Sequence, residues 1–600
     1  MVPRTDSTLA RQIFRRNHRR GHGVHGWREL DHRDRWARRA LRGRRFLSAG
    51  LQRGISGIHG RDHAGHVRNN THRASSVADS FARIPRCPIR NRRGACGVHV
   101  GDSENPHGCC FTRRRTRGRW FAHCACRTFP RGPRGPRCPG SDGTVTDGPR
   151  SASRERLVDG YFARRTIADL AADLRARRVS SRDLVGIALE EAERSQSAIN
   201  AFVTIDRDGA CATAAEADRE LAYGVDRGVL HGVPMAVKDM IDVRGQPTTA
   251  GSRHFANRIA DRDAGSVARL RRAGAIPIGK TTTHEFANGP TGDRSSTGPT
   301  RNPHALGYIA GGSSSGSAAA VAAGIVPFAL GTDTGGSVRI PAACCGVVGV
   351  RPTQGAIESS GVYPLAESMD TVGVLAGAVA DARAVLSALI DGFTARTEMT
   401  AVARVGWLSP QAFHPAQDSV VRSTRDLVAS LVTDEVDLPG ADELLHTYRV
   451  IQGREAHGVH AERLDSAPEL YGSEVRARLE MGGAYTNAQL SQALSVREQV
   501  RVRAAQLLAT VDFLVLPTIP FSVPALFSRR AIIGDREVDV PAGLLALTAP
   551  WSLLGLPAVS IPAADVDGVP VGLQIVGRAH AEAELLSFAA HLETQRPERG

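Results

Sequence analysis

Short apolar runs alternate with helical stretches over most of this chain, from about residue 166 to residue 595. Alternation of this kind predicts an α/β fold, in which helices cover the faces of a sheet. The strand-like runs are 233–237, 275–278, 326–330, 346–350, 511–516, 557–561 and 570–576. The helix-like segments between them include 264–273, 316–323, 374–390, 449–464 and 488–509.

Helix start signals mark the beginning of the ordered part. Thr166 precedes an apolar series that begins at Ile167, and Asp169 stands three residues after it, as in a capping box. A second helix is expected after Ser180, with Asp183 in its first turn. The sequence after these two helices contains no internal repeat and no linker to a second domain. The pattern therefore predicts a single large domain, 159–600, with a mixed β-sheet core covered by helices.

Residues 1–158 form an Arg-rich extension with neither helical nor strand periodicity. The chain carries a net charge of +16, yet residues 1–150 alone hold 33 Arg, no Lys and only 10 acidic residues. The rest of the chain is therefore mildly acidic. A segment so poor in aliphatic side chains cannot bury enough apolar surface to offset the entropy of ordering.

Three interpretations of this extension compete. Arginine runs such as 113–119 would bind the phosphates of a nucleic acid. Cys and His are frequent, but Cys109-Cys110 and Cys124-Ala-Cys126 do not form the paired C-x2-C units of a zinc site. A start codon placed too far upstream, or an out-of-frame stretch of GC-rich DNA, would also produce this composition. We favour this third interpretation, or plain disorder, over nucleic-acid binding.

Cysteine usage and hydropathy bear on the compartment. Beyond residue 150 there are only Cys211, Cys344 and Cys345, and the adjacent pair lies in an apolar run. This pattern indicates buried thiols and is typical of a reducing cytoplasm. No apolar run is long enough to span a membrane, and no apolar segment follows the arginine pair at 44–45 that an export signal would need. We therefore expect a cytoplasmic protein without membrane association.

Lysine is unusually scarce, with Lys238 and Lys280 standing against 75 arginines. Arginine cannot be deprotonated, whereas a desolvated lysine can act as a base. Lys238 ends the apolar run 233–237 and is a candidate general base. The alternative is a lysine whose ammonium group reaches the surface. We interpret Lys280 as structural, because no serine segment requires a second base.

Residues 311–317 read Gly-Gly-Ser-Ser-Ser-Gly-Ser and precede an alanine-rich helix. A phosphate-binding loop would need a Lys-Ser/Thr ending, which is absent. The pattern Gly312-x-Ser314-x-Gly316 also fits a nucleophile elbow, which requires a downstream Asp and His. A flexible linker is disfavoured by the predicted strand and helix on either side. No surrounding sequence motif marks any downstream histidine as the partner that such a nucleophile needs. The downstream histidines are His414, His446, His457, His460 and His580.

Residues 331–339 read Gly-Thr-Asp-Thr-Gly-Gly-Ser-Val-Arg and follow the strand-like run 326–330. Two glycines before Ser337 let a substrate carbonyl approach the backbone, where successive N–H groups converge on one oxygen. That is the geometry of an oxyanion hole, in which one donor contributes about 3–4 kcal/mol. The alternative is a plain turn in which Ser337 caps a helix.

Together, these three segments resemble the amidase signature family of serine hydrolases. Lys238 and Ser313 are 75 residues apart, and Ser313 and Ser337 are 24 apart, as in that family. The likeness covers about 164–595. Ala310 departs from the family pattern, in which proline is frequent at this position. Further similar stretches are 248–252, 279–281, 301–303, 346–353, 556–558 and 572–574.

The resemblance implies roles for individual residues. Ser337 would be the nucleophile, and Ser313, in a cis peptide, would bridge it to Lys238. The oxyanion would be held by the backbone N–H groups of Thr334, Gly335, Gly336 and Ser337. Supporting positions without a direct part in the reaction would be Asp333, Ser314 and Arg339. The resemblance implies neither a metal nor a cofactor.

The function implied is that of an amidase that hydrolyses the C–N bond of a linear, small-molecule carboxamide through a serine acyl-enzyme. A homodimer is left open. The alternative is the glutamine-hydrolysing A subunit of a tRNA-dependent amidotransferase, although 410–510 lacks the tyrosine-rich segment associated with those subunits. A catalytically dead or nucleic-acid-binding protein is disfavoured by the intact triad. The substrate pocket is expected within 355–550.

Overall fold

The computed structural model describes residues 156–394 and 403–596 of the chain. All of them belong to one compact unit, Pro139–Gly600. The predictions made for the Arg-rich extension fall on residues 1–155, which lie outside the described residues.

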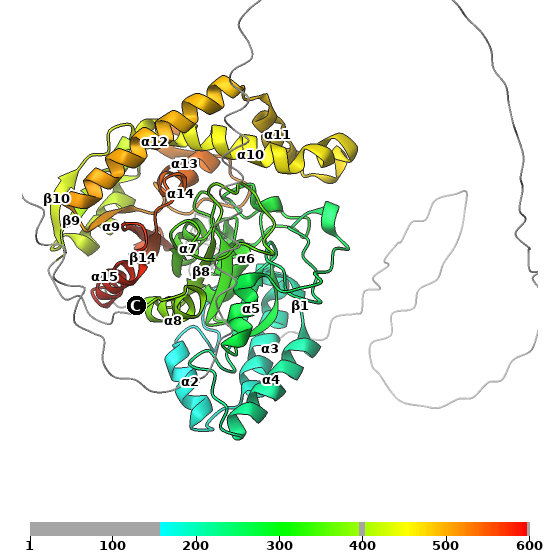
Figure 1. The fold of residues 1–600 in the computed structure, drawn as a ribbon. Helices are drawn as coiled ribbons and strands as arrows, with labels where there is room; N and C mark the ends of the chain where they lie inside the picture. Colours follow the sequence, from blue (N-terminus) through cyan, green and yellow to red (C-terminus); the bar gives the residue numbers. More distant parts are fainter. Residues whose placement is uncertain (1–155, 395–402, 597–600) are drawn as a thin grey trace, which may run out of the picture. The chain divides into compact units, whose positions relative to one another are not determined.

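A sheet of eleven strands runs through this unit (Figure 1). The two triplets β3-β2-β6 and β11-β9-β10 are parallel, and all other neighbours are antiparallel. The mixed sheet with its helices confirms the predicted α/β fold. In spatial order the strands are β1 (Phe202–Ile205), β3 (Ile276–Thr281), β2 (Pro234–Lys238), β6 (Phe328–Thr332), β8 (Val372–Ala376), β7 (Val348–Arg351), β14 (Ala558–Val566), β15 (Val569–Val576), β11 (Phe513–Pro517), β9 (Val405–Leu408) and β10 (Val432–Val436).

Strands β3, β2 and β6 are buried along their whole length. Continuous apolar runs are typical of parallel strands, because both faces of the sheet are covered. Since neighbouring parallel strands end at the same edge, Lys238 at the end of β2 lies beside the end of β6. The segment 331–339 leaves the sheet at that edge. The fold thus brings together two of the segments singled out in the sequence.

The helices pack against the sheet and against each other. Helices α3 and α4 contact one another and β3, whereas α7 packs on β7, β14 and β15. Helix α10 packs against α11 and α12, yellow to orange in Figure 1, and also contacts α13 and α14. The described α-helices are α2 (Ile167–Arg175), α3 (Ser181–Ile199), α4 (Arg207–Ala222), α5 (Gly265–Arg272), α6 (Ser315–Ala322), α7 (Arg339–Cys345), α8 (Val379–Leu389), α9 (Asp418–Val428), α10 (Leu444–Ser466), α11 (Ser473–Ala484), α12 (Asn487–Thr510), α13 (Val540–Ala546), α14 (Ala549–Leu553) and α15 (Glu582–Thr594).

The two predicted helix starts are confirmed. The Thr166 hydroxyl accepts the backbone N–H of Asp169, whose carboxylate accepts the N–H of Thr166. Ser180 and Asp183 form the same reciprocal pair at the start of α3. Each capping residue satisfies an otherwise unpaired helix N–H and stabilises its helix by about 1 kcal/mol.

The seven predicted strands are all present, but the helix predicted over 374–390 is wrong at its start. Its first residues belong to β8, which pairs with β6 on one side and β7 on the other, and α8 begins only at Val379. Pairing on both sides outweighs the local helical pattern. Strands β1, β9 and β10, as well as the short pairs β4–β5 (Arg301–Asn302, Ala305–Ile309) and β12–β13 (Arg530–Ile533, Arg536–Asp539), were not anticipated.

Two further sequence expectations concern burial. Cys344 and Cys345 are buried free thiols in α7, as predicted, and burial raises the pKa of Cys344 to about 12. Within residues 156–394 and 403–596, we find no helix with both the length and the apolar character needed to cross a membrane.

Candidate active site

Lys238 is wholly buried at the end of β2, so the surface alternative is wrong. Its Nζ lies 2.7 Å from Ser313 Oγ and 2.7 Å from Thr332 Oγ1. Burial lowers the pKa of this amine to about 7, and the opposing pull of Asp333 and Asp370 is smaller. A large fraction of Lys238 is therefore neutral near pH 7, and neutral lysine can accept a proton from Ser313.

Ser313 follows a cis peptide bond after Gly312. Its carbonyl oxygen accepts the backbone N–H of His284 at 3.1 Å. The next residue, Ser314, donates its backbone N–H to the carbonyl oxygen of Ser337, also at 3.1 Å. This hydrogen bond joins the two serine segments directly.

Ser337 lies in the loop between β6 and α7. The N–H groups of Thr334, Gly335 and Ser337 have no hydrogen-bond acceptor in the described part of the chain. The N–H of Gly336, in contrast, donates to Asp333 Oδ1 at 2.9 Å. Of the four N–H groups that we expected to hold an oxyanion, that of Gly336 is thus already engaged, and the other three lack a protein acceptor among the described residues.

Both glycines of this loop are required by their surroundings. A Cβ on Gly335 would lie 2.4 Å from the hydroxyl oxygen of Tyr448. Gly336 has a φ of +127°, and a Cβ there would lie 2.2 Å from Thr548 Oγ1. Only glycine fits such close approaches, and only glycine adopts this backbone conformation readily.

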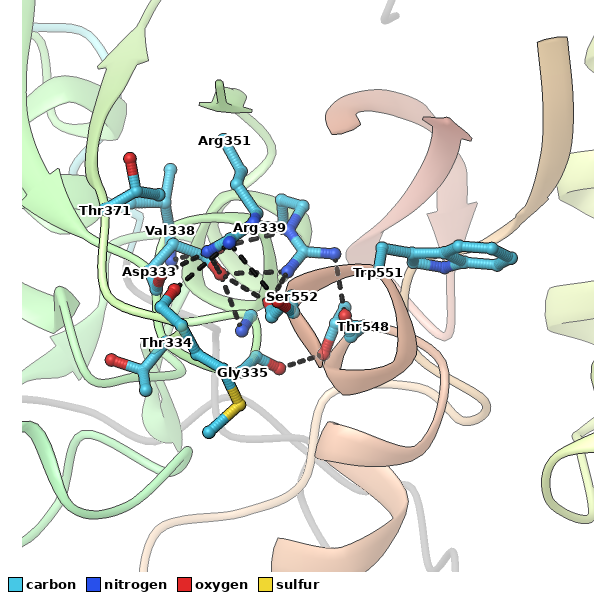
Figure 2. Close-up of polar contacts among 12 residues, drawn as sticks. Asp333, Thr334, Gly335, Val338, Arg339, Arg351, Thr371, Thr548, Trp551 and Ser552 are labelled. Atoms are coloured by element: carbon cyan, nitrogen blue, oxygen red, sulfur yellow. Dashed lines mark hydrogen bonds and ion pairs between the residues drawn. The ribbon is translucent and has the colours of Figure 1, made fainter. Parts of the chain in front are cut away.

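The carboxylate of Asp333 holds the loop in place through several hydrogen bonds (Figure 2). Arg339 donates to both of its carboxylate oxygens, at 2.9 and 3.0 Å, and Arg351 and Ser552 donate at 3.3 and 3.0 Å. Although burial would raise it, the two guanidinium groups hold the pKa of Asp333 well below its usual value. Thr548 Oγ1 donates to the Gly335 carbonyl at 2.7 Å and ties the loop to the segment before α14. These bonds support the predicted loop-orienting roles of Asp333 and Arg339.

The nucleophile-elbow alternative at Ser314 finds no support. Ser314 is wholly buried, and its Oγ exchanges hydrogen bonds of 3.3 Å with the backbone of Thr332. No hydrogen bond joins Ser314 to a histidine anywhere in residues 156–394 and 403–596. Its contacts are those of the supporting residue that we expected.

Lys280 lies in a separate buried cluster. Its Nζ is 3.2 Å from Asp239 Oδ1, 2.8 Å from Thr248 Oγ1 and 3.0 Å from the Pro247 carbonyl oxygen. Asp239 also accepts the backbone N–H of Thr249. The ion pair holds the 247–249 turn against the sheet, which supports the structural interpretation of Lys280.

A cavity of about 750 Å³ opens beside Ser337. Its walls come from the turn 287–290, helices α10 and α11, and the segment from β12 to α13. Most of the lining falls within the expected 355–550 region, but the turn 287–290 does not. Within the described ranges, no group of three or more His, Cys, Asp or Glu side chains is arranged to hold a metal. The apolar lining includes Leu365, Tyr448, Met481, Pro541 and Leu545.

A family model described as Amidase matches residues 183–586. This chain belongs to the amidase family. The A subunit of the glutamyl-tRNA(Gln) amidotransferase of Aromatoleum aromaticum is 36% identical to it over 481 residues, covering 71% of this chain and 96% of that protein. A crystal structure of an amidase is 34% identical, with a TM-score of 0.68, and covers 72% of this chain and all of the other. The structure of the corresponding A subunit from Thermotoga maritima is 29% identical, with a TM-score of 0.61, covering 74% and 97%. The chain is thus an enzyme that acts on amide C–N bonds.

Some residues of this amidase site were not anticipated. Thr332 contacts Lys238 as closely as Ser313 does, and Arg351 joins Arg339 on Asp333. Asp370 accepts the Thr334 hydroxyl at 2.5 Å, and burial raises its pKa to about 6. Thr332 ends a predicted strand next to the Ser337 segment, which is a usable signal. Arg351 stands in the stretch 346–353 that resembles the family, although the sequence assigned it no role, whereas Asp370 stands in a segment without a distinctive pattern.

Proposed function

We propose that this chain cleaves carboxamide C–N bonds through an acyl-enzyme on Ser337. The observation that carries the proposal is the buried contact between Lys238 Nζ and Ser313 Oγ. The residue after Ser313, Ser314, donates its backbone N–H to the Ser337 carbonyl oxygen and so ties this contact to the Ser337 segment. A base whose pKa is about 7 and a loop with free N–H groups are the two parts that this chemistry requires.

The first half-reaction forms an ester. Neutral Lys238 accepts the proton of Ser313 Oγ, which in turn accepts the proton of Ser337 Oγ. Ser337 Oγ attacks the amide carbon, and the carbonyl oxygen becomes an oxyanion held by the N–H groups of Thr334, Gly335 and Ser337. When the C–N bond breaks, the proton on Lys238 returns through Ser313 to the leaving nitrogen, which departs as ammonia or an amine.

The second half-reaction releases the acid. Water gives a proton to the same Lys238–Ser313 relay and attacks the ester carbon, and the same N–H groups hold the oxyanion. The C–O bond to Ser337 then breaks and Ser337 recovers its proton from the relay. The products are a carboxylic acid and the free enzyme.

The experiment that tests this proposal is a panel of aliphatic, aromatic and amino-acid amides, including glutamine, assayed with the wild type and with Ser337→Ala. We expect Ser337→Ala to abolish turnover of every amide that the wild type hydrolyses. Turnover unaffected by Ser337→Ala would refute the mechanism.

A second, narrower candidate is the glutaminase reaction of an amidotransferase A subunit. The curated relatives carry that name at 34–36% identity and are covered over 93–98% of their length, which favours it over the stand-alone amidase that we ranked first from the sequence. The chemistry at Ser337 is the same. Selectivity for glutamine, together with stimulation by the partner subunits of a tRNA-dependent amidotransferase, would establish this candidate. Equal turnover of many amides without partners would exclude it.

A further inference from the structure

Among the arginines that line the cavity beside Ser337, Arg449 alone has no carboxylate partner in the residues that the structure describes. Both lining carboxylates already have partners: Glu474 accepts hydrogen bonds from Arg294 and Arg529, and Asp539 accepts the backbone N–H of Ala542. Three of the four lining arginines are paired as well. Arg529 lies 3.0 Å from both Asp293 and Glu474, Arg478 lies 3.4 Å from Glu474, and Arg530 lies 3.8 Å from Glu537. The charged residues of the lining are four arginines, Arg449, Arg478, Arg529 and Arg530, and the two acids Glu474 and Asp539.

Helix α10 presents a stripe of polar side chains to this cavity. His446, Arg449 and Gln452 are spaced by three residues, which places them on one face of the helix, and all three line the cavity. Arg449 makes no hydrogen bond or ion pair with any residue that the structure describes. Arg478, in contrast, donates to the Asn288 carbonyl oxygen at 2.7 Å and to Glu474 Oε2 at 3.4 Å.

Gln452 offers a second hydrogen-bond donor, because its Nε2 is buried and lacks a hydrogen-bond partner among the described residues. A buried N–H group without an acceptor is costly, so such groups are nearly always satisfied. An acceptor oxygen of the substrate, one turn from the Arg449 guanidinium, would satisfy it. A carboxylate accepts from both donors at once and also matches the positive charge.

We infer that the substrate of this site is an amide whose acyl part carries a carboxylate, held by Arg449 and Gln452 while the amide carbonyl lies at Ser337. The inference rests on the proposed function, since it concerns the substrate of that same serine. It assigns Arg449 and Gln452 as specificity-determining residues, with no part in the bond-breaking steps. A cationic amide of the same length would be repelled by the unpaired Arg449 guanidinium.

Matched amides test the inference. One series is pentanamide, glutaramic acid and 5-aminopentanamide; a second is octanamide, suberamic acid and 8-aminooctanamide, so that two lengths are covered. We expect the wild type to prefer the acid over the neutral amide in at least one series, by about 10- to 100-fold in kcat/KM, the range of a charge-assisted hydrogen bond. No preference for the acid in either series would overturn the inference.

Variants of Arg449 and Gln452 test whether these two residues bind the carboxylate. Arg449→Gln and Gln452→Leu should each lower the acid-to-neutral ratio, and Arg449→Glu should shift the preference toward the cationic amide. Arg422→Gln is the matched control, because it removes an exposed arginine of α9 that does not line the cavity. An acid-to-neutral ratio that falls equally in Arg422→Gln, or in none of the α10 variants, would overturn the assignment.

Binding measurements distinguish a failure of the carboxylate inference from a failure of the proposed mechanism. In the Ser337→Ala protein, glutaramic and suberamic acid and the matching neutral amides, pentanamide and octanamide, are titrated calorimetrically, with and without Arg449→Gln. We expect Arg449→Gln to weaken binding of the preferred acid by about 10- to 100-fold. If Ser337→Ala still hydrolyses amides, the proposed mechanism fails. If Ser337→Ala is inactive but binds acid and neutral amides equally, only the carboxylate inference fails.

Discussion

Among single residues, the mechanism depends most on a neutral Lys238. Because burial lowers its pKa to about 7, the basic form predominates above that pH. We therefore expect kcat/KM to rise with pH through about 7 and then to level off. Lys238→Arg keeps the positive charge but cannot be deprotonated, so it should lower kcat by about 10²- to 10⁴-fold. A pH–rate profile and the Arg variant check this, and an active Lys238→Arg enzyme would refute the base role.

Gly336 allows a test of the loop that holds the oxyanion. Gly336→Ala combines an unfavourable φ of +127° with a Cβ only 2.2 Å from Thr548 Oγ1, so it should displace the loop and lower kcat by more than about 100-fold. Gly355→Ala is the control, because Gly355 also has a positive φ, +82°, but open space around it. That variant should cost only about 1–2 kcal/mol of stability, with activity retained. Equal activity losses would show that the contact with Thr548 is unimportant.

Between elements, the close packing of α10 on α11 shapes the cavity wall. A Cβ on Gly482 of α11 would lie 2.1 Å from the Gly453 carbonyl oxygen of α10. Gly482→Ala should therefore push the helices apart and lower the free energy of unfolding by about 1–3 kcal/mol. Gly458→Ala, at an exposed position of the same α10 with nothing within 4 Å, should instead stabilise by about 0.5–1 kcal/mol. Denaturant unfolding of both variants measures these differences, and destabilisation by Gly458→Ala would contradict the steric explanation.

The helices and strands also show how much of the fold can be predicted from the sequence alone. Buried parallel strands such as β2 and β6 are continuous apolar runs, and helices such as α3 begin with a capping box, so local patterns predict them. The strand β8 was assigned to a helix because its apolar residues run on into α8, and its pairing with β6 and β7 leaves no local signal in the sequence. The site follows the same rule. Glycine-rich segments and a rare lysine indicate Lys238 and Ser337 in the sequence, whereas the tertiary fold alone gives Asp370 its hydrogen bond with Thr334 and places Arg449 in the cavity wall.

For the whole molecule, we predict that the amidase unit works without the Arg-rich extension. The unit is anchored near its start by hydrogen bonds from Leu157 N–H to the Pro303 carbonyl oxygen and from Gly160 N–H to the Ala323 carbonyl oxygen. A chain beginning at residue 156 keeps both bonds, the whole sheet and the cavity. Its kcat/KM should equal that of the full chain in a side-by-side assay. Loss of all hydrolase activity would show that the extension contributes to the fold or to the site.

The most direct test of the central claim is to locate the covalent intermediate. A fluorophosphonate that labels activated serines is added, the protein is digested with trypsin, and the labelled peptide is fragmented by mass spectrometry. Ser313, Ser314 and Ser337 all lie in the peptide 302–339, which contains no internal Lys or Arg, so fragment ions must place the added mass. The account predicts a label on Ser337 alone, absent in Ser337→Ala and strongly reduced in Lys238→Arg. A label on Ser313 or Ser314, or labelling that persists in Ser337→Ala, would contradict it.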